Sequence, residues 1–279
     1  MDYNPIYNDQ QNVPADFPAG MMPVVFASSG EKLLGTMFMA QGKGPHPTVL
    51  LLHGFPGNES NFDLAHIIRR LGWNVFVFHY RGSWGSEGEY SFNNSLEDTS
   101  AAINFLRAAS SKEVYRCDPE KIVLIGHSLG GFAALMKSAE DESIQNAASL
   151  ACVNFGFLSS LISGSDDAKE IAMDYLKIGS NMLSGTSADK LFDEMMENTV
   201  NWNLLNKIGD LSQKNLLLIC ATHDSIASPE IHHNPLVGLL EGVGSKNLSQ
   251  FELNTGHSFS DKRIKLAEHI VEWLNSINF

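Results

Sequence analysis

The sequence predicts an α/β fold, with a mostly parallel, twisted sheet of eight strands and helices on both faces. Apolar or β-branched runs recur along the chain, and most of them are separated by segments of helical length. Runs that are apolar at consecutive positions are typical of strands covered on both faces, and their alternation with helices is typical of a parallel sheet. The length of 279 residues fits one such unit with a large insertion.

The first two predicted strands, 23–27 and 33–40, form an antiparallel hairpin. They flank a polar segment that contains Gly30, which suits a tight turn. The remaining predicted strands are the runs 48–52, 74–79, 121–126, 148–154, 216–221 and 247–253.

Helical periodicity and end signals mark several of the intervening segments. Residues 62–71 carry apolar side chains at helical spacing, with basic residues in the last turn and Gly72 at the stop. Asn94 and Glu97 resemble a capping box that begins the next helix. Residues 264–274 predict a final amphipathic helix over one face of the sheet.

One segment, 155–210, shows no clear strand and reads as helices interrupted by glycines. We expect it to be a helical cap inserted into the sheet domain. The predicted organisation is an N-terminal extension at 1–22, a core made of 23–154 and 211–279, and this cap. The apolar side chains of the cap are interpreted mainly as its own small core, with substrate lining as the alternative; they are Met173, Leu176, Met182, Leu183, Leu191, Phe192, Met195 and Met196.

The charge balance excludes some classes of partner. Acidic residues outnumber basic ones, 32 to 19, for a formal charge of −13. Such a surface repels phosphate backbones and anionic membranes, and the basic residues form no cluster. We therefore expect no nucleic-acid partner.

Cysteine usage and the N-terminal sequence predict a cytoplasmic protein. The three cysteines are widely separated, and Cys152 and Cys220 lie in apolar runs that suit buried free thiols. Residues 1–20 lack the basic start and apolar centre of a secretory signal. We expect no membrane span, because no apolar run approaches the roughly 20 residues that a span needs. The oligomeric state is left open, with a homodimer as one option.

A serine stands between glycines in the stretch GHSLGG, 126–131, directly after an apolar run. Glycines two residues before and after Ser128 suit a backbone bent so sharply that a Cβ at either position would collide with its neighbours. Such a bend would present the Ser128 hydroxyl as a candidate nucleophile. The alternative is an ordinary strand-to-helix turn in which Ser128 only caps the helix.

A nucleophile for acyl transfer also needs donors that stabilise the developing oxyanion. The run 48–52 leads into the loop HGFPG, 53–57, at the end of a predicted strand, where parallel sheets open their binding crevice. Phe55 is the candidate backbone donor, because Pro56 has no N–H. The N–H of Leu129, which begins the helix after the serine, is the second candidate. A plain glycine turn at 53–57 is the alternative.

The general base and its orienting acid are expected in loops after the late strands. His257 follows the last apolar run and precedes the final helix, whereas His53 and His127 belong to the glycine turns. His223 also follows a late strand, but the adjacent Asp224 fits the orienting carboxylate better. The resulting chain order is serine, acid, histidine.

Other carboxylates are weaker candidates for the acid. Asp166 and Asp167 are the acids nearest to the alternative position after the preceding strand. Glu97 and Asp98 suit a helix start, and Asp261 suits the cap of the last helix.

These motifs resemble those of the α/β-hydrolase superfamily, and within it those of serine esterases and dipeptidyl-type peptidases that read HGF-x-G and YRGxGxSxG. The chain has HGFPG at 53–57 and YRGSWGSEG at 80–88. Trp84 adds one residue to the second motif, which leaves the shape of that loop and the role of Arg81 open. After Asp224 the chain reads SIAS, where relatives often carry a Val-Pro pair.

The resemblance implies an α/β-hydrolase fold with a nucleophile elbow, a triad of Ser128, His257 and Asp224, and an oxyanion hole formed by the N–H groups of Phe55 and Leu129. The implied reaction is hydrolysis of a small or medium acyl ester through an acyl-enzyme, with peptide-like amides and thioesters as alternative substrates. No metal or organic cofactor is expected, because HExxH, P-loop and dinucleotide glycine motifs are absent from the sequence. A catalytically silent ligand-binding module is the alternative of another class.

Overall fold

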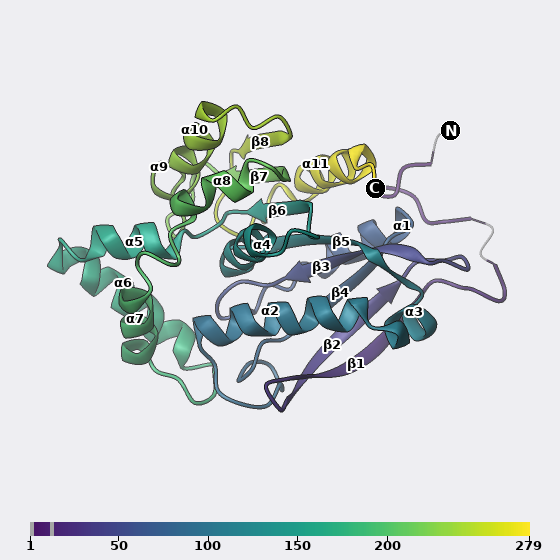
Figure 1. Ribbon diagram of the computed structural model, residues 1–279, viewed down its shortest axis with the longest axis horizontal. Coiled ribbons are helices and arrows are strands. Elements are labelled where there is room, and N and C mark those ends of the chain that lie inside the picture. The colour runs from purple at the N-terminus through teal and green to yellow at the C-terminus, as the bar shows by residue number, and fades with distance from the viewer. Residues whose placement is uncertain (1–2, 12–13) are drawn as a thin grey trace.

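The strands of the computed structural model, which describes residues 3–11 and 14–279, form one sheet in the order β1-β2-β4-β3-β5-β6-β7-β8 (Figure 1). Pairing from β3 through β8 is parallel, as is the pairing of β3 with β4, whereas β2 pairs antiparallel with β1 and β4. The predicted eight-stranded, mostly parallel sheet is confirmed. Its strands are β1 Gly20–Ser28, β2 Glu31–Met39, β3 His46–Leu52, β4 Asn74–Phe78, β5 Cys117–His127, β6 Asn146–Leu150, β7 Asn215–Ala221 and β8 Leu248–Leu253.

Helices cover both faces of this sheet (Figure 1). The helices are α1 Phe62–Arg70, α2 Phe92–Arg107, α3 Ala109–Tyr115, α4 Leu129–Glu140, α5 Phe155–Ile162, α6 Asp166–Ser180, α7 Ala188–Glu197, the 3₁₀ turn η1 Leu204–Lys207, α8 Ile208–Leu211, α9 Pro229–His232, α10 Asn234–Gly242 and α11 Arg263–Ser276.

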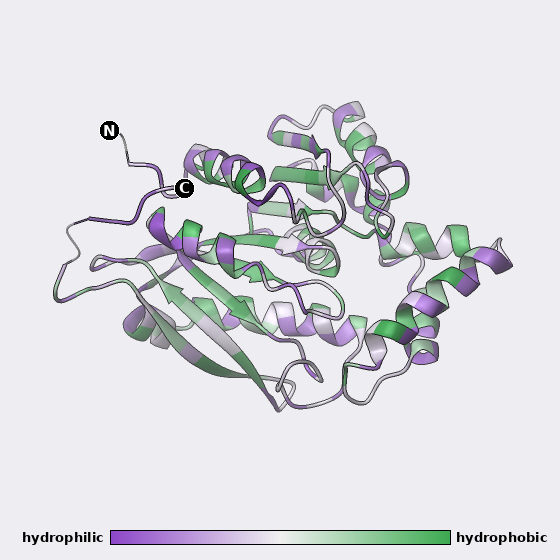
Figure 2. Ribbon diagram, turned by 180° about the vertical axis from the view of Figure 1, so that it is seen from behind, coloured by the Kyte–Doolittle hydropathy of each residue, from purple (hydrophilic) through white to green (hydrophobic). Residues whose placement is uncertain are grey.

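Alternate side chains of the central strands belong to two separate hydrophobic clusters. In β3, Leu50 and Leu52 pack in the cluster that contains α2 and α4, whereas Val49 and Leu51 pack in the cluster that contains α1 and α11. Because successive side chains of a strand point to opposite faces, a continuous apolar run serves both clusters. The strands at the centre of Figure 2 accordingly have hydrophobic colours along their length, while the helices alternate.

Several predicted element boundaries are wrong; strand β5, for example, begins at Cys117 rather than at 121. Strand β6 ends at Leu150 rather than at 154, because Ala151 has a left-handed φ of 47° and turns the chain out of the sheet. Helix α2 begins at Phe92, and its N-cap is Ser91, whose hydroxyl accepts a hydrogen bond from the Asn94 N–H at 3.0 Å. Asn94 therefore lies inside the helix and is not its cap.

The segment 155–210, between β6 and β7, contains α5, α6, α7, η1 and α8. Figure 1 shows α5, α6 and α7 at one end of the molecule, opposite the C-terminus. The Glu194 carboxylate on α7 accepts hydrogen bonds from the N–H groups of Phe92 and Asn93 at 2.8 and 2.9 Å, so this segment is joined to the first turn of α2. Its function as a cap stays a prediction.

The predicted N-terminal extension, 1–22, overlaps the sheet, because β1 already begins at Gly20. Residues 1–2 and 12–13 of that extension lie outside the described residues. Within the described part, the Tyr3 hydroxyl donates to the carbonyl of Arg70 at 2.9 Å, so the extension contacts the end of α1. Among the helices described here, none is long and apolar enough to span a bilayer.

Candidate active site

Ser128 stands at the sharp turn between β5 and α4. Its backbone angles, φ 57° and ψ −118°, lie in a region that side chains with a Cβ rarely adopt. The Ser128 N–H donates to the Leu150 carbonyl at 2.8 Å, and its carbonyl accepts from the Phe132 N–H at 3.1 Å. These bonds to β6 and α4 hold the strained turn.

The neighbouring glycines are required by close backbone contacts. A Cβ on Gly126 would lie 1.9 Å from the carbonyl oxygen of Gly130, and a Cβ on Gly130 would lie 2.2 Å from the carbonyl oxygen of Leu52. The interpretation that these glycines make room for the bend is confirmed. Ser128 occupies the N-cap position of α4, but its hydroxyl makes no capping hydrogen bond. The hydroxyl is therefore available for another role.

Asp224 and His257 form a hydrogen-bonded pair beyond the ends of β7 and β8. The distance from His257 Nδ1 to Asp224 Oδ2 is 2.7 Å. The other carboxylate oxygen, Oδ1, accepts from the N–H groups of Ile226 and Ala227, each at 2.8 Å. The first turn after β7 thus fixes the carboxylate, and the carboxylate fixes the imidazole.

The electrostatics of Asp224 favour its ionised form. Burial would raise its pKa, but the hydrogen bonds from His257 and from two backbone N–H groups together lower the pKa below the ordinary value for aspartate. An ionised carboxylate only accepts hydrogen bonds, so His257 Nδ1 carries a proton, and in the neutral form of the ring Nε2 has a free lone pair. This is the tautomer that a general base needs.

Ser128 and His257 line one cavity of about 260 Å³. In the part of the chain that the structure describes, no hydrogen bond within 3.5 Å joins the Ser128 hydroxyl to His257. Hydrogen bonds between a nucleophile and its base are often loose without substrate and tighten in the complex.

His127 is a residue of this site that sequence reasoning missed. Its Nε2 lies 2.9 Å from the carbonyl oxygen of His257, and because a carbonyl only accepts, Nε2 carries the proton. Burial lowers the pKa of His127 to about 4, so the ring is neutral at pH 7. The residue before the nucleophile therefore holds the loop of the candidate base, and the 130-residue separation of the two gave no signal in the sequence.

Among the residues that the structure describes, neither candidate oxyanion donor has a protein acceptor. Leu129 begins α4, and the first N–H groups of a helix have no partner within it. Among the described residues, the Phe55 N–H donates to no backbone or side-chain acceptor. The loop that contains Phe55 approaches the serine closely, since a Cβ on Gly54 would lie 3.0 Å from the Cβ of Ser128.

A second cavity, of about 300 Å³, is also lined by Ser128. It shares Phe55, Ser128, Tyr175 and Ile226 with the first. Its other lining residues come mostly from α5, α6 and α7 and are mainly apolar, and none of its lining residues is Asp, Glu, Lys or Arg.

Helix α6 packs directly on the loop that contains Phe55. A Cβ on Gly179 would lie 2.2 Å from the Phe55 ring, so only a glycine permits this approach. One turn earlier, the Tyr175 hydroxyl lies 3.4 Å from the Phe55 carbonyl oxygen. The helix and the loop are therefore in direct contact at the boundary of both cavities.

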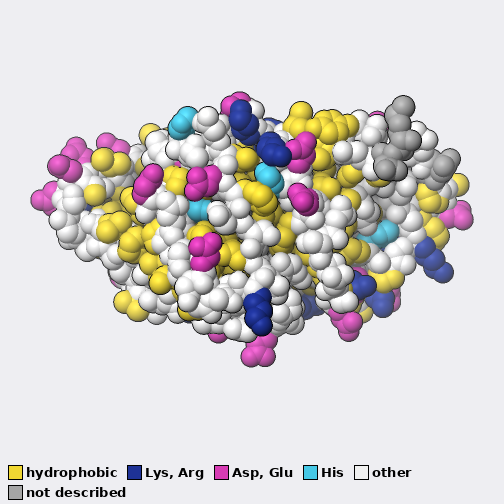
Figure 3. All heavy atoms as spheres, turned by 90° about the horizontal axis from the view of Figure 1, so that it is seen from above, with side chains coloured by type: hydrophobic (Ala, Val, Ile, Leu, Met, Phe, Trp, Pro, Cys, Tyr) yellow, Lys and Arg dark blue, Asp and Glu magenta, His cyan; other side chains and the backbone are white. Residues whose placement is uncertain are grey.

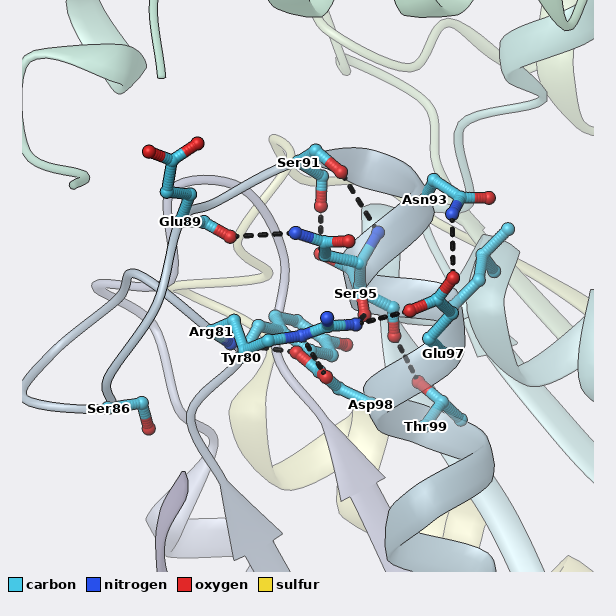
Figure 4. Close-up of polar contacts among 12 residues, drawn as sticks. Tyr80, Arg81, Ser86, Glu89, Ser91, Asn93, Ser95, Glu97, Asp98 and Thr99 are labelled. Atoms are coloured by element: carbon cyan, nitrogen blue, oxygen red, sulfur yellow. Dashed lines mark hydrogen bonds and ion pairs between the residues drawn. The ribbon is translucent and has the colours of Figure 1, made fainter. Parts of the chain in front are cut away.

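Arg81, whose role the sequence left open, anchors the loop 80–88 (Figure 4). Its Nε and its backbone N–H each donate to the buried Asp98 carboxylate at 2.7 Å, and its guanidinium also contacts Glu97 at 2.7 Å. Glu97 and Asp98 thus hold this loop from within α2 rather than begin that helix.

The loop 80–88 in turn supports the loop 53–57. The Tyr80 hydroxyl donates to the His53 carbonyl at 3.3 Å, and Trp84 Nε1 donates to the Pro56 carbonyl at 2.8 Å. The extra residue in the second motif, Trp84, adopts a positive φ of 48° and provides one of these contacts.

The rival carboxylates lie elsewhere. Asp166 and Asp167 are exposed in the first turn of α6. Asp261 accepts a hydrogen bond from the Thr255 hydroxyl, and the N-cap residue of α11 is Lys262, so the interpretation of Asp261 as that cap is wrong. In residues 3–11 and 14–279, no group of three or more His, Cys, Asp or Glu side chains could hold a metal ion.

Comparison with known proteins gives the family. The model of the alpha/beta hydrolase family matches residues 49–259. The chain belongs to this family. The match includes the whole site described above, from the loop 53–57 to His257.

Several curated proteins match parts of this alpha/beta hydrolase. An uncharacterized protein of Salmonella typhimurium, YfhR, is 34% identical over 135 residues, which cover 46% of this chain and 44% of that protein. The alpha/beta hydrolase domain-containing protein WAV2 of Arabidopsis thaliana is 28% identical over 189 residues, covering 66% of this chain and 54% of WAV2. The matches therefore span about half the length of these relatives.

Solved structures share the fold of this alpha/beta hydrolase at low sequence identity. An esterase from Pyrococcus furiosus has a TM-score of 0.66 and 18% identity, with 93% of this chain and 91% of that one covered. An acylaminoacyl peptidase from Pyrococcus horikoshii has a TM-score of 0.70 and 16% identity, with 99% of this chain and 43% of that one covered. The predicted resemblance to esterase and peptidase relatives is confirmed at the level of the fold.

Proposed function

We propose that the protein is a serine hydrolase that cleaves small to medium acyl esters, with Ser128 as nucleophile, His257 as general base and Asp224 as the acid that orients it. The observation that carries this proposal is the arrangement around one cavity. Ser128 lines it with a hydroxyl not used for capping, beside a His257 whose Nδ1 is held 2.7 Å from Asp224.

The proposed reaction transfers the acyl group first to the serine and then to water. His257 Nε2 takes the proton of Ser128 as its oxygen attacks the ester carbonyl, and then gives it to the departing alcohol. The N–H groups of Phe55 and Leu129 stabilise the oxyanion of each tetrahedral intermediate, a role in which loss of one donor typically costs about 10²–10³ in turnover. His257 next activates a water molecule that releases the acid.

The chemistry of the 300 Å³ cavity supports an uncharged acyl group as its occupant. Its lining has no fully charged side chain, and burial lowers the pKa of its single histidine, His232, to about 4. Figure 3 shows acidic side chains gathered at the end of the molecule formed by α5, α6 and α7, and exposed residues there include Asp166, Asp167 and Glu170. These carboxylates would repel an anionic substrate.

A peptidase acting on a free amino terminus is the second candidate. A substrate amine needs an anionic partner, and Glu59 lines the 260 Å³ cavity beside Ser128 and His257. The Glu59 carboxylate already accepts from the Asn61 N–H at 2.7 Å, which leaves acceptor capacity for an ammonium group. Turnover of aminoacyl amides in preference to p-nitrophenyl esters, and its loss in Glu59→Gln, would favour this function over the esterase.

Labelling with a fluorophosphonate tests whether Ser128 is activated. We expect the probe to modify Ser128 alone, as located by mass spectrometry, and Ser128→Ala to abolish both labelling and ester turnover while the melting temperature stays close to that of the native protein. Loss of the nucleophile alone costs about as much as loss of a whole triad, on the order of 10⁶ in turnover. An unlabelled protein without esterase activity would instead indicate a silent binding module.

Substitution of the acid tests the pairing of Asp224 with His257. Asp224→Asn is expected to lower kcat by about 10⁴, because an amide at this position favours the wrong imidazole tautomer. Asp167→Asn, on the exposed first turn of α6, is the matched control and should keep native kcat. If the control loses activity and Asp224→Asn keeps it, the acid is assigned wrongly.

A further inference from the structure

His232 is a buried histidine of the site that the proposed mechanism does not use. It ends α9, eight positions after Asp224, and only 3% of its surface is exposed. Its Nδ1 accepts a hydrogen bond from the Asn154 N–H at 3.0 Å. Because the Asn154 N–H can only donate, Nδ1 must accept with a free lone pair, and the proton of this neutral ring is on Nε2.

His232 lines the 300 Å³ cavity beside Ser128. Within the described residues, no acceptor bonds to its Nε2–H, yet Nε2 is not one of the fully enclosed polar atoms that lack a partner. Because only 3% of the surface of His232 is exposed and the residue lines this cavity, we assign the accessible part of the ring to the cavity. A donor with a fixed orientation therefore faces the open space.

The segment that carries His232 contributes the polar side chains Ser225 and Ser228 to this cavity, beside the apolar Ile226 and Ile231. The lining residues from α5 and α6 are mostly apolar. A donor in such surroundings is costly to leave unpaired and discriminates between ligands that do and do not supply an acceptor. An all-carbon chain would leave the Nε2–H without a partner.

We propose that His232 is a specificity-determining residue, whose Nε2–H donates a hydrogen bond to an oxygen atom on the acyl chain of the substrate. The cavity then selects esters whose chain carries an ether, keto or similar acceptor oxygen over all-carbon chains of equal length. This inference rests on the proposed function, because it takes the cavity as the acyl site.

An oxygen scan of the acyl chain tests the proposal. The probes are p-nitrophenyl octanoate and its analogues in which an ether oxygen replaces each chain methylene in turn. With the native protein we expect kcat/KM to peak at one oxygen position. In His232→Asn the preference for that position over octanoate should fall about tenfold.

The Asn variant separates the two functions of the ring. Its side-chain oxygen can take the place of Nδ1 as acceptor for Asn154, but nothing replaces the Nε2–H. His232→Gln, whose amide reaches toward the Nε2 position, should restore part of the preference. His233→Asn is the matched control, because His233 is buried next in the chain but does not line the cavity, and it should keep the native profile.

Binding without turnover keeps the test independent of catalysis. In Ser128→Ala, calorimetry with the corresponding uncleaved methyl ketones should show the highest affinity at the same oxygen position. This preference should disappear in the double variant that also carries His232→Asn. A flat oxygen profile, or one that His232→Asn leaves unchanged, would overturn the proposal. Failure of fluorophosphonate labelling, by contrast, would overturn the proposed function, and the ketone series would still decide whether His232 recognises an oxygen.

Discussion

At the scale of the residue, the turn at Ser128 depends on backbone contacts so close that Gly126 and Gly130 have no room for a Cβ. The sequence predicted this turn, because glycine spacing directly reports where a Cβ is forbidden. It could not predict His127 or His232, whose contacts with His257 and Asn154 join residues 130 and 78 positions apart. Which ring nitrogen of a histidine carries the proton depends on such partners, and the spacing of residues along the sequence does not reveal it.

Replacement of one turn glycine is expected to destabilise the whole fold. Gly126→Ala would place a Cβ 1.9 Å from the Gly130 carbonyl oxygen, and the backbone shift that relieves this contact should lower the free energy of unfolding by about 3 kcal/mol. Gly238→Ala is the control, since a Cβ there meets nothing within 4 Å inside α10, and it should add about 0.5–1 kcal/mol. Urea denaturation measures the free energy of unfolding of both variants. Equal midpoints for the two variants would contradict the steric argument.

At the scale of the element, the strands were predictable and some helix starts were not. The central strands β3, β4 and β7 consist largely of consecutive apolar residues, as is typical of strands buried on both faces. The start of α2 was predicted wrongly, because Asn94 and Glu97 resemble a capping box. Ser91 caps the helix instead, and the structure uses Glu97 to hold Arg81. A carboxylate near a helix start has the same sequence signature in either role.

The pair of Asp98 and Arg81 should be essential to the link between α2 and the loop 80–88. Asp98→Ala leaves a buried guanidinium without its main partner, so we expect the free energy of unfolding to fall by about 3–5 kcal/mol. Lys177→Ala is the matched control, because it removes an exposed ion pair with Asp174 and should change stability by less than about 0.5 kcal/mol. Thermal melts of the two variants test this, and similar shifts in both would contradict it.

At the scale of the whole molecule, buried neutral histidines make the fold sensitive to acid. Burial lowers the pKa of His53 to about 3 and those of His127 and His232 to about 4. In the unfolded chain these rings take up protons near pH 6.5. Between that pH and 4 the unfolded state therefore binds more protons than the folded state, and stability falls as the pH falls.

The size of this effect is measurable. Each histidine contributes about 1.4 kcal/mol per pH unit, so the three together should lower the free energy of unfolding by up to about 4 kcal/mol per unit between pH 6 and 4. Stability contributed by these neutral rings is fully present above pH 6.5. Urea unfolding at a series of pH values measures how the free energy of unfolding changes with pH. His223→Gln, which removes an exposed histidine, is the control. A flat profile from pH 6.5 to 4.5 would contradict the prediction.

The contact between Gly179 and the Phe55 ring has a consequence for the timing of the reaction. Because α6 rests on this ring and also lines both cavities, any displacement of the helix would remove packing from the Phe55 side chain. In the proposed mechanism the Phe55 N–H is an oxyanion donor, so its position would depend on where α6 lies. A change in the position of α6 would then be coupled to the assembly of the proposed donor pair.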